Sequence, residues 1–487
     1  MKKIIFLLAF TVSFSQSSPQ IDHVVLLLME NQPFDKFFGF MQEELPGIEG
    51  LTGNECFDDG SGTKTCVQQT AKYVCDGGGS MGYNEMVNEI FGMNNWDGKA
   101  GTIPPAEQPQ DGWMEVTNNV EVVAQFKPDA NPIKSALAKQ FGIFNKWHSS
   151  FPGPSTPNHL FIMTATSGGC TTTGEDYQCE TGKTFPQKTV FENLEANNNT
   201  WAYYYNDTTW NYFLEYFNTP AGVAGVQGYD EFYDRAAKGT LPNFSFILPR
   251  QGENQTTGMG PNDDHPCHDI ALGELLIKDT YEAVRAGPKW NNTLLLITYD
   301  DTGGWYDHHR VPTGVPAPDD VKACGAADTD FTWLGLRTPT LLVSPWISKG
   351  KVIQEPDGPY KDSEYEHSSI SATLKSLFDL PNFLTKRDAW AGDFSKELDL
   401  NEPTNQGPMH LPEPPAPATG ELATHGKVSY DELTRRQRRR VQGISRACGV
   451  DPPDNWELFT HAEAEKYIAK WERIHRDNSR TRRIEEF

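Results

Sequence analysis

Residues 21–29 read IDHVVLLLM, and this stretch decides the fold. It is a short and nearly uninterrupted apolar run, which is typical of a strand that is buried on both faces of a parallel sheet. Three further runs share this pattern, at residues 244–248, 293–299 and 340–344. The sequence therefore predicts several fully buried strands.

Helical patterns accompany these runs. Residues 269–286 carry apolar side chains at helical spacing, and residues 370–378 form a second such pattern. Asp269 stands where a helix N-cap is expected. Strands that alternate with helices predict an α/β fold around a mainly parallel central sheet. We expect the long loops at residues 41–80, 98–118 and 167–186 to cover the sheet edge where a ligand binds.

Polar side chains follow two of the predicted strands directly. Glu30 and Asn31 come after the first run, and Asp300 and Asp301 come after residues 293–299. Ligands bind outside the carboxyl ends of strands in open α/β sheets, so these four side chains are expected to converge. Each pair alone is more often a cap or a turn. Together they predict a site for a divalent metal ion, which prefers such hard oxygen ligands.

A proline-rich turn offers a hydroxyl group. Residues 151–159 read FPGPSTPNH, where three prolines fix the backbone around Ser155 and Thr156. A hydroxyl held beside a metal ion can act as a nucleophile, although an ordinary loop would look the same locally. The turn lacks the Gly-x-Ser-x-Gly context of an α/β-hydrolase, which argues against a Ser/His/Asp triad.

Several histidines and one more acid are candidates for supporting roles. His265 and His268 lie in a loop before residue 269, and they could contact a phosphate, protonate a leaving group, bind metal or simply lie on the surface. Asp307 and His308 follow the Asp300-Asp301 pair. His367 precedes the second predicted helix.

The composition excludes some classes of protein. The chain has 487 residues with 42 basic and 66 acidic side chains, for a formal net charge of −24. Such a charge repels nucleic acid. With 37% hydrophobic and 11% aromatic residues the chain is not disordered, and its length suits one large domain with additions.

The N-terminus predicts secretion. Residues 1–17 combine two lysines, a short apolar run and small polar residues, as a signal peptide does, and no run is long enough to span a membrane. Eight cysteines without a Cys-x2-Cys pair favour disulfides over zinc binding, with Cys170–Cys179 as our predicted pair. Five glycosylation sequons fall within a hundred residues, at Asn198, Asn206, Asn243, Asn254 and Asn291.

The C-terminal part differs in composition. Residues 402–420 form a proline-rich linker, which separates a catalytic domain at residues 18–401 from a helical segment at residues 421–487. That segment holds 14 basic and 12 acidic residues, with five arginines among residues 435–440. It suits either a solvated helix packed on the domain or a peripheral contact with anionic lipid.

These motifs together resemble a known family. Residues 30–39 read ENQPFDKFFG, which is similar to the ENxxFDxxFG opening of the phosphoesterase family of non-specific phospholipases C and related acid phosphatases. Further segments are similar in order and context, with the plant-type phospholipase C branch most similar: residues 154–158, 263–274, 299–308, 365–379 and 383–390.

The resemblance implies a fold like that of alkaline phosphatase, with helices on both faces of the sheet. It implies that Ser155 is the nucleophile, with Thr156 as the fallback, and that His265 contacts phosphate. Glu30, Asn31, Asp300 and Asp301 would hold the metal ion. Attack by Ser155 on phosphorus would give a phosphoseryl intermediate, which water then hydrolyses. Supporting roles would fall to the remaining candidates, Asn158, His268, Asp307, His308 and His367.

Four positions depart from the family pattern. Asp301 and Thr302 stand where plant-type members have Glu-His, and the Asp-Asp pair is more like the acid phosphatase branch. His159 replaces an arginine, so a titratable group replaces a permanent cation. Gly79 stands where plant-type members carry a phosphate-contacting histidine, a role that His148 could fill.

We therefore expect a secreted phosphoesterase that hydrolyses phospholipid head-group diesters. An acid phosphatase acting on soluble monoesters is the first alternative, and a weakly catalytic glycoprotein that binds lipid is the second. The retained ligands and Ser155 argue against the binding protein.

Overall fold

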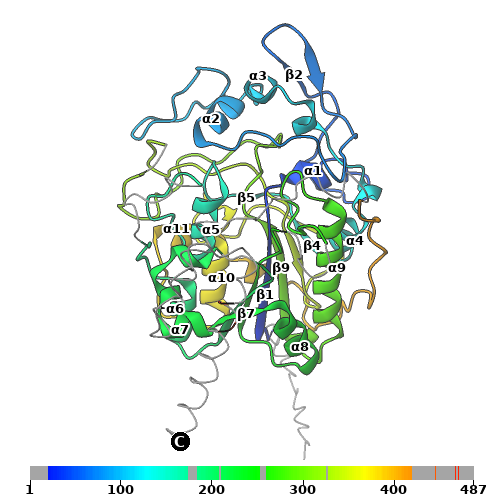
Figure 1. Cartoon of the computed structure of the whole chain (residues 1–487), viewed down its shortest axis with the longest axis vertical. Coiled ribbons are helices and arrows are strands. Elements are labelled where there is room, and N and C mark those ends of the chain that lie inside the picture. The colour runs from blue at the N-terminus through cyan, green and yellow to red at the C-terminus, as the bar shows by residue number, and fades with distance from the viewer. Residues whose placement is uncertain are drawn as a thin grey trace, which may run out of the picture.

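The structure is a computed structural model that describes residues 20–173, 184–207, 210–252, 259–324 and 327–418, with Ser445, Tyr467 and Lys470 (Figure 1). Four features predicted from the sequence lie outside these residues: the signal peptide, Cys179, the sequon residue Asn254 and nearly all of the basic segment 421–487.

An eight-stranded sheet forms the centre of the molecule, in the order β11-β4-β10-β9-β1-β8-β6-β7. β1 lies between β8 and β9 and is parallel to both. The stretch that decides the fold is therefore the middle of the sheet. The strands are β1 (His23–Met29), β4 (Gly142–Phe144), β6 (Trp201–Tyr205), β7 (Val226–Gly228), β8 (Phe244–Ile247), β9 (Thr293–Tyr299), β10 (Leu341–Val343) and β11 (Lys351–Ile353).

The prediction of a mainly parallel sheet is confirmed, with one strand reversed. β10 is present where residues 340–344 predict it, but it runs antiparallel to β9 and β4. The chain leaves β9 at its carboxyl end and enters β10 from that same edge, which reverses its direction. The remaining pairs are parallel.

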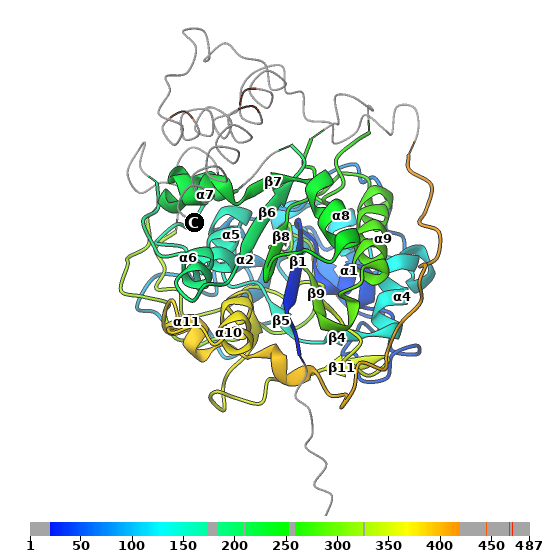
Figure 2. The same ribbon diagram turned by 90° about the horizontal axis from the view of Figure 1, so that it is seen from below.

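Helices cover both faces of the sheet (Figure 2). Alternate residues of β1 point to opposite faces: Val25 and Leu27 pack with α4, α8 and α9, whereas Val24 and Leu26 pack with α5, α6 and α10. The helices are α1 (Phe34–Phe38), α4 (Pro132–Gln140), α5 (Ser155–Thr164), α6 (Val190–Glu195), α7 (Pro220–Ala224), α8 (Tyr229–Lys238), α9 (Ile270–Ala286), α10 (Ser368–Leu377) and α11 (Lys386–Trp390).

The helix predicted at residues 269–286 is confirmed as α9, together with its cap. The Asp269 side chain accepts a hydrogen bond from the backbone N–H of Ala271. The helix predicted at residues 370–378 is confirmed as α10, which begins two residues earlier and ends one residue earlier.

A cap lies over the carboxyl edge of the sheet, at the top of Figure 1. It contains α2 (Tyr83–Phe91), α3 (Trp113–Thr117) and the hairpin of β2 (Cys56–Asp58) and β3 (Lys64–Cys66). Its own aromatic core includes Tyr83, Trp113 and Trp333. The predicted role of loops 41–80 and 98–118, to cover this edge, agrees with their place.

The disulfide predicted between Cys170 and Cys179 is wrong. Cys170 is a buried free thiol, and burial raises its pKa to about 12. The structure contains the disulfides Cys56–Cys66, within the β2–β3 hairpin, and Cys75–Cys267. The second of these joins the cap to the loop before α9, two segments 192 residues apart.

The described part of the proline-rich linker packs on the domain. Tyr281 and Lys278 of α9 donate hydrogen bonds to backbone carbonyls of Pro408 and Leu411, and Asp269 accepts one from Ala418. Residues 408–418 are therefore held along α9 rather than extended into solvent.

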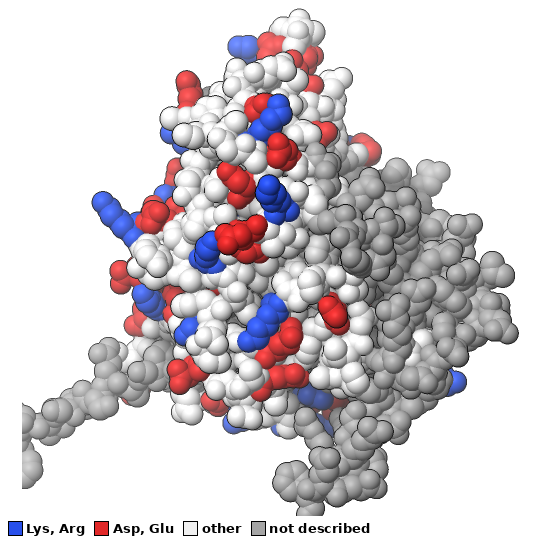
Figure 3. Space-filling model, turned by 90° about the vertical axis from the view of Figure 1, so that its left-hand side faces the viewer, with Lys and Arg blue, Asp and Glu red and all other residues white. Residues whose placement is uncertain are grey.

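The surface suits some of the predicted sequons better than others. Asn198, Asn206 and Asn291 are exposed, whereas the amide nitrogen of half-buried Asn243 donates to the Asp22 carbonyl. The face shown in Figure 3 carries acidic and basic side chains interspersed. Among the described residues, no helix is long and apolar enough to span a membrane.

Candidate active site

The ends of β1 and β9 bring the predicted acidic residues together. The two strands are in register up to Met29 and Tyr299, so Glu30 and Asp300 begin side by side at the carboxyl edge. The Asp300 N–H donates to the Met29 carbonyl, 3.1 Å away. All four predicted metal-site residues are buried, with at most 2% of each side chain exposed.

Asn31 connects the two strand ends through its backbone and side chain. Its backbone N–H donates to Asp300 Oδ1 at 2.8 Å, and its Nδ2 donates to Asp301 Oδ1 at 2.7 Å. These bonds require a left-handed backbone with φ of 58°, which asparagine tolerates better than most residues. Gly303 completes the turn, donating its N–H to Asp301 Oδ1 with φ of 64°.

The proline-rich turn places Ser155 at this edge. Ser155 is the first residue of α5, and its Oγ donates to Asp301 Oδ2 at 3.1 Å and lies 3.4 Å from Asn31 Oδ1. Asn158 shapes the turn, because its amide bonds the Phe151 N–H and the carbonyls of Phe151, Gly153 and Pro154. The sequence predicted the hydroxyl, and the structure places Asn158 behind it as a positioning residue.

Thr156 lies deeper than Ser155. Its side chain is fully buried, and its Oγ1 has no hydrogen-bond partner among the described residues. Of the two hydroxyls, that of Ser155 donates a hydrogen bond to a carboxylate at the strand ends, whereas that of Thr156 has no such bond to any described residue. This arrangement favours Ser155 as the nucleophile.

His159 joins the acidic residues, a role that sequence reasoning missed. Its Nε2 lies 3.0 Å from Glu30 Oε1 and 3.3 Å from Asp300 Oδ2. One ligand atom from each of these three buried residues lies within 4.8 Å of the other two. The signal was the spacing of His159 four residues after Ser155, which puts both on one face of a helix. Gln251 also donates to Glu30 Oε1, at 2.7 Å.

The electrostatics of the strand ends are unbalanced. Burial and the neighbouring Asp300 charge raise the pKa of Asp301. Burial opposes the ionisation of Asp300 too, but His159 and the Asn31 N–H outweigh it and lower the pKa of Asp300. Among the described residues, no lysine or arginine forms an ion pair with either aspartate. A cation bound here would relieve this repulsion.

The histidine loop docks on the end of β1. The Asp263 carbonyl accepts from the Glu30 N–H at 2.8 Å, and Asp263 Oδ1 lies 2.6 Å from His268 Nδ1. His265 is half-buried, and burial followed by the nearby His268 lowers its pKa. The two rings lie 5.2 Å apart. Both predicted histidines are therefore at the site, as a pair of which His268 is oriented by a carboxylate.

His367 supports Asp300 from behind. Its Nε2 lies 2.6 Å from the Asp300 carbonyl, and Trp147 Nε1 donates to its Nδ1 at 3.3 Å. With Nδ1 as the acceptor, the Nε2–H donates to Asp300. Burial lowers the pKa of His367 to about 4, so the ring is neutral at pH 7 and positions the backbone that carries Asp300.

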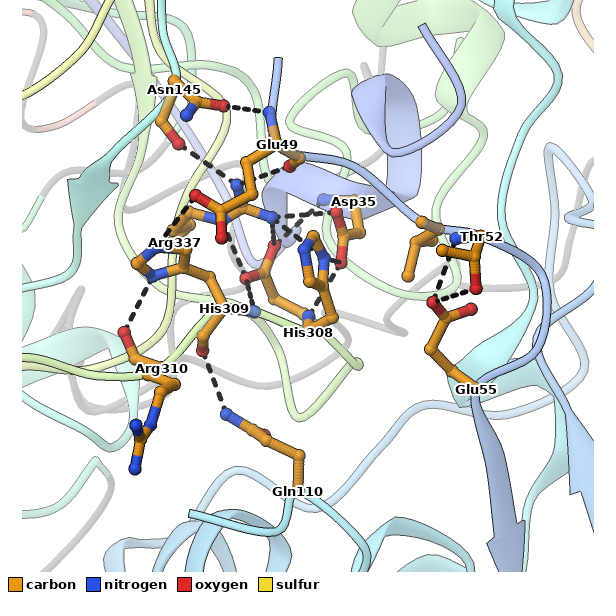
Figure 4. A network of polar contacts seen from close by, with 12 residues as sticks. Asp35, Glu49, Thr52, Glu55, Gln110, Asn145, His308, His309, Arg310 and Arg337 are labelled. Carbon is orange, nitrogen blue, oxygen red and sulfur yellow. Dashed lines mark hydrogen bonds and ion pairs between the residues drawn. The ribbon is translucent and has the colours of Figure 1, made fainter. Parts of the chain in front are cut away.

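Asp307 and His308 lie in another cluster, which we call the Arg337 cluster: Asp35, Asp307, His308 and Arg337. Figure 4 shows how Asp35, His308 and Arg337 face one another. Arg337 donates to Asp35 Oδ1 at 2.9 Å and to Asp307 Oδ1 at 2.8 Å, and all three side chains are fully buried. His308 Nδ1 lies 2.7 Å from Asp35 Oδ2. Within the part of the chain that the structure describes, Ser155 forms its hydrogen bonds with Asn31 and Asp301 and none with this cluster.

The structure describes Gly79, which stands at the position of the family histidine, and His148, which was considered as its replacement. A side chain at Gly79 would overlap the backbone of Gly304, so the two loops pack too closely to admit one. His148 is fully buried, bonds the Gly335 carbonyl through Nδ1 and packs beside His309 of the 300–309 segment. It belongs beside the Arg337 cluster.

Comparison with known proteins identifies the family. A model of the phosphoesterase family matches residues 21–381, about three quarters of the chain. The chain belongs to the phosphoesterase family. It is thus a hydrolase that acts on phosphoric esters, as the six motifs predicted.

Relatives of this chain occur in plants and in bacteria. Non-specific phospholipase C6 of Arabidopsis thaliana is 39% identical over 81% of this chain and 75% of its own length, and non-specific phospholipase C1 of the same plant is 36% identical over 92% and 84%. The match to the plant-type branch is confirmed. A solved alkaline phosphatase superfamily protein from Vibrio parahaemolyticus, 10% identical, covers 78% of this chain and 71% of its own with a TM-score of 0.36.

The residues at the strand ends fit a divalent metal ion. Glu30 and Asp300 offer carboxylate oxygens and His159 offers a ring nitrogen within one small volume. Asp300 Oδ2 is buried and accepts no hydrogen bond from the described residues. Asn31 and Asp301 lie one hydrogen bond further on, between these groups and Ser155. The prediction that both are ligands remains a prediction.

Proposed function

We propose that this protein is a secreted phospholipase C-type enzyme, which hydrolyses head-group phosphodiesters of phospholipids with Ser155 as the nucleophile. One observation carries the proposal: Ser155 Oγ lies at hydrogen-bond distance from Asp301, beside the Glu30–His159–Asp300 group. The names of the plant relatives favour a phospholipid substrate.

In the first step, Ser155 Oγ attacks phosphorus while the bond from phosphorus to the glycerol oxygen breaks. Ser155 Oγ already donates a hydrogen bond to Asp301 Oδ2, so this carboxylate is placed to take the hydroxyl proton during the attack. The turn around Asn158 fixes the hydroxyl before substrate arrives, which lowers the ordering cost of the attack.

The leaving diacylglycerol oxygen needs a proton. His268, oriented by Asp263, and His265 beside it are the titratable groups of the loop that docks on Glu30. We assign the proton transfer to this pair. In the second step water attacks phosphorus and gives a proton back to the histidine pair, while the bond to Ser155 Oγ breaks and the proton held by Asp301 returns to Ser155.

A divalent metal ion, when bound, would stabilise the charge that develops on the phosphoryl oxygens. Glu30, His159 and Asp300 would hold it. The family relationship and the buried carboxylates support this assignment.

An acid phosphatase acting on soluble monoesters is the second candidate, because the chain has Asp300-Asp301 where plant-type members have Asp-Glu. The turn at Asp301 is built around the shorter side chain, whose two oxygens both accept hydrogen bonds. Residues 1–17 support secretion, and the basic segment 421–487 supports peripheral membrane contact.

The test supplies the purified protein with phosphatidylcholine vesicles and, in parallel, with an aryl phosphate monoester. Diacylglycerol and free phosphate are quantified, with Ser155→Ala as the matched inactive variant. Diacylglycerol with little phosphate supports the phospholipase. Phosphate from the monoester without diacylglycerol replaces it with the acid phosphatase, and undiminished activity of Ser155→Ala moves the nucleophile elsewhere.

A further inference from the structure

His159 occupies an unusual position for a buried histidine. It lies one helical turn after Ser155 on α5, with no exposed surface. Its Nε2 faces two carboxylates from two different strand ends, 3.0 Å from Glu30 Oε1 and 3.3 Å from Asp300 Oδ2. Helix α5 and the ends of β1 and β9 thus bring His159 Nε2 close to one oxygen each of Glu30 and Asp300.

We propose that His159 is a direct ligand of the divalent metal ion, and that this nitrogen makes the centre select zinc-like transition ions over magnesium and calcium. The inference rests on the proposed function only in assuming that the protein holds an ion at the strand ends.

The ring of His159 is fixed by packing. It stacks on Trp210 with ring centroids 4.3 Å apart and an interplanar angle of 20°. Its other nitrogen, Nδ1, has no hydrogen-bond partner among the described residues. Stacking and the α5 backbone therefore set the orientation of the ring, with Nε2 directed at the carboxylates whatever the substrate.

The simplest other role for His159 is that of a protonated donor to both carboxylates. The distances from His159 Nε2 to the two carboxylate oxygens do not support donation to both. The shorter one, to Glu30 Oε1, is a hydrogen bond, whereas Asp300 Oδ2 accepts none from the described residues although it lies 3.3 Å from Nε2. A metal ion between the three atoms satisfies Asp300 Oδ2 as well, and uses the neutral imidazole lone pair.

The donor set determines which ions are preferred. Sites made of oxygen alone suit magnesium, calcium and manganese, whereas an imidazole nitrogen favours zinc, iron and nickel. An arginine at this position could not bind a metal, because a guanidinium stays protonated. The imidazole of His159 supplies the nitrogen donor on which the metal preference of this chain depends.

X-ray absorption on the full-length protein, stripped with a chelator and loaded with one equivalent of zinc, tests the ligand directly. No substrate is present. We expect nitrogen and oxygen donors at about 2.0–2.2 Å and the multiple scattering of an imidazole ring. A spectrum with oxygen donors alone would overturn the proposal, and this result needs no variant.

His159→Gln and the matched control His410→Gln extend the test. His410 is exposed and pairs with Glu282 on α9, far from the strand ends along the chain. Competition between zinc and magnesium should show a loss of zinc preference of about tenfold or more in His159→Gln. The control should match the wild type. Equal zinc preference in His159→Gln, with a native near-ultraviolet spectrum, contradicts the proposal.

The metal measurement and the lipid assay separate two failures. A zinc centre that depends on His159, in a protein that releases no diacylglycerol, supports this inference and removes the proposed function. If the protein releases diacylglycerol but its metal has only oxygen donors, the proposed function is supported and this inference is removed.

Discussion

Two groups of buried carboxylates lie at the carboxyl side of the sheet, and they are neutralised in different ways. In the Arg337 cluster, one fully buried guanidinium donates to Asp35 and Asp307 and stacks 4.3 Å over the Phe34 ring. At the strand ends, Asp300 and Asp301 have no lysine or arginine partner among the described residues. The Arg337 cluster thus contains its own cation, whereas the carboxylates at the strand ends would obtain one by binding a metal ion.

Charge balance explains the difference. The fork of Arg337 satisfies several carboxylate oxygens in one geometry, so the cluster is complete without any ligand. Asp301 keeps a raised pKa and a serine proton at hydrogen-bond distance. The carboxylates at the strand ends therefore lack a balancing cation, which is the basis of the chemistry that we propose for them. Four experiments can break or sharpen this contrast.

Ser155→Ala has the largest expected effect, which is a loss of turnover. This variant tests the residues at the strand ends and leaves the Arg337 cluster unchanged. Removing the nucleophilic oxygen should lower turnover by about 10⁴-fold or more, because Asp301 accepts no hydrogen bond from any other described hydroxyl. Metal content and melting temperature should stay near those of the wild type. Steady-state kinetics with metal analysis checks this, and turnover within tenfold of the wild type would assign the attack to another group.

Arg337→Met should produce the largest loss of stability. It leaves Asp35 and Asp307 buried without their partner, which costs about 3–5 kcal/mol. Denaturant unfolding measures this. Lys386→Met is the control, because it breaks the exposed pair with Asp320 and should cost less than about 1 kcal/mol. If both variants unfold alike, the Arg337 cluster is not the structural group described above.

Removing the metal ion should lower stability through the carboxylates at the strand ends and not through the Arg337 cluster. An ion present at 100 times its dissociation constant stabilises the folded state by about 2.7 kcal/mol. Chelation should therefore lower the melting temperature of the wild type and of Lys386→Met equally. Asp300→Asn should show little change, because it lacks a ligand. An equal response of Asp300→Asn would place the ion elsewhere.

The smallest predicted effect concerns pH. Burial, followed by the charge of the neighbouring His309, lowers the pKa of His148 to about 3. The unfolded chain then binds a proton below about pH 6.5 that the folded chain does not, so stability falls as the pH falls towards 3. His148 should contribute about 2 kcal/mol of loss between pH 7 and pH 5.

His148→Gln should flatten this dependence, and the exposed His410→Gln should not. Unfolding at pH 7 and pH 5 measures the difference. The same slope in His148→Gln and the wild type would mean that His148 is not held neutral.

Local patterns were enough to predict the strand ends. Glu30 and Asp300 meet because their strands are buried, parallel and in register, and the apolar runs fix where each strand stops. The same holds for Asp269, whose capping role depends only on the helix that follows it. Ser155 could be proposed because its turn is rigid by composition.

Non-local packing could not be predicted from one sequence. Arg337 and Asp35 are 302 residues apart, and neither segment contains a pattern that predicts contact with the other. The reversal of β10 and the Cys75–Cys267 disulfide depend on how distant segments return to the sheet. His159 was interpreted as a replaced cation, since its approach to Glu30 appears only when α5 is packed on the sheet.

Anomalous diffraction from crystals of the zinc-loaded protein would test the contrast between the two carboxylate groups most directly. We predict one strong peak within about 2.0–2.3 Å of oxygens from Glu30 and Asp300 and of His159 Nε2, and no peak among Asp35, Asp307 and His308. A peak in the Arg337 cluster, or none at the strand ends, would contradict the account.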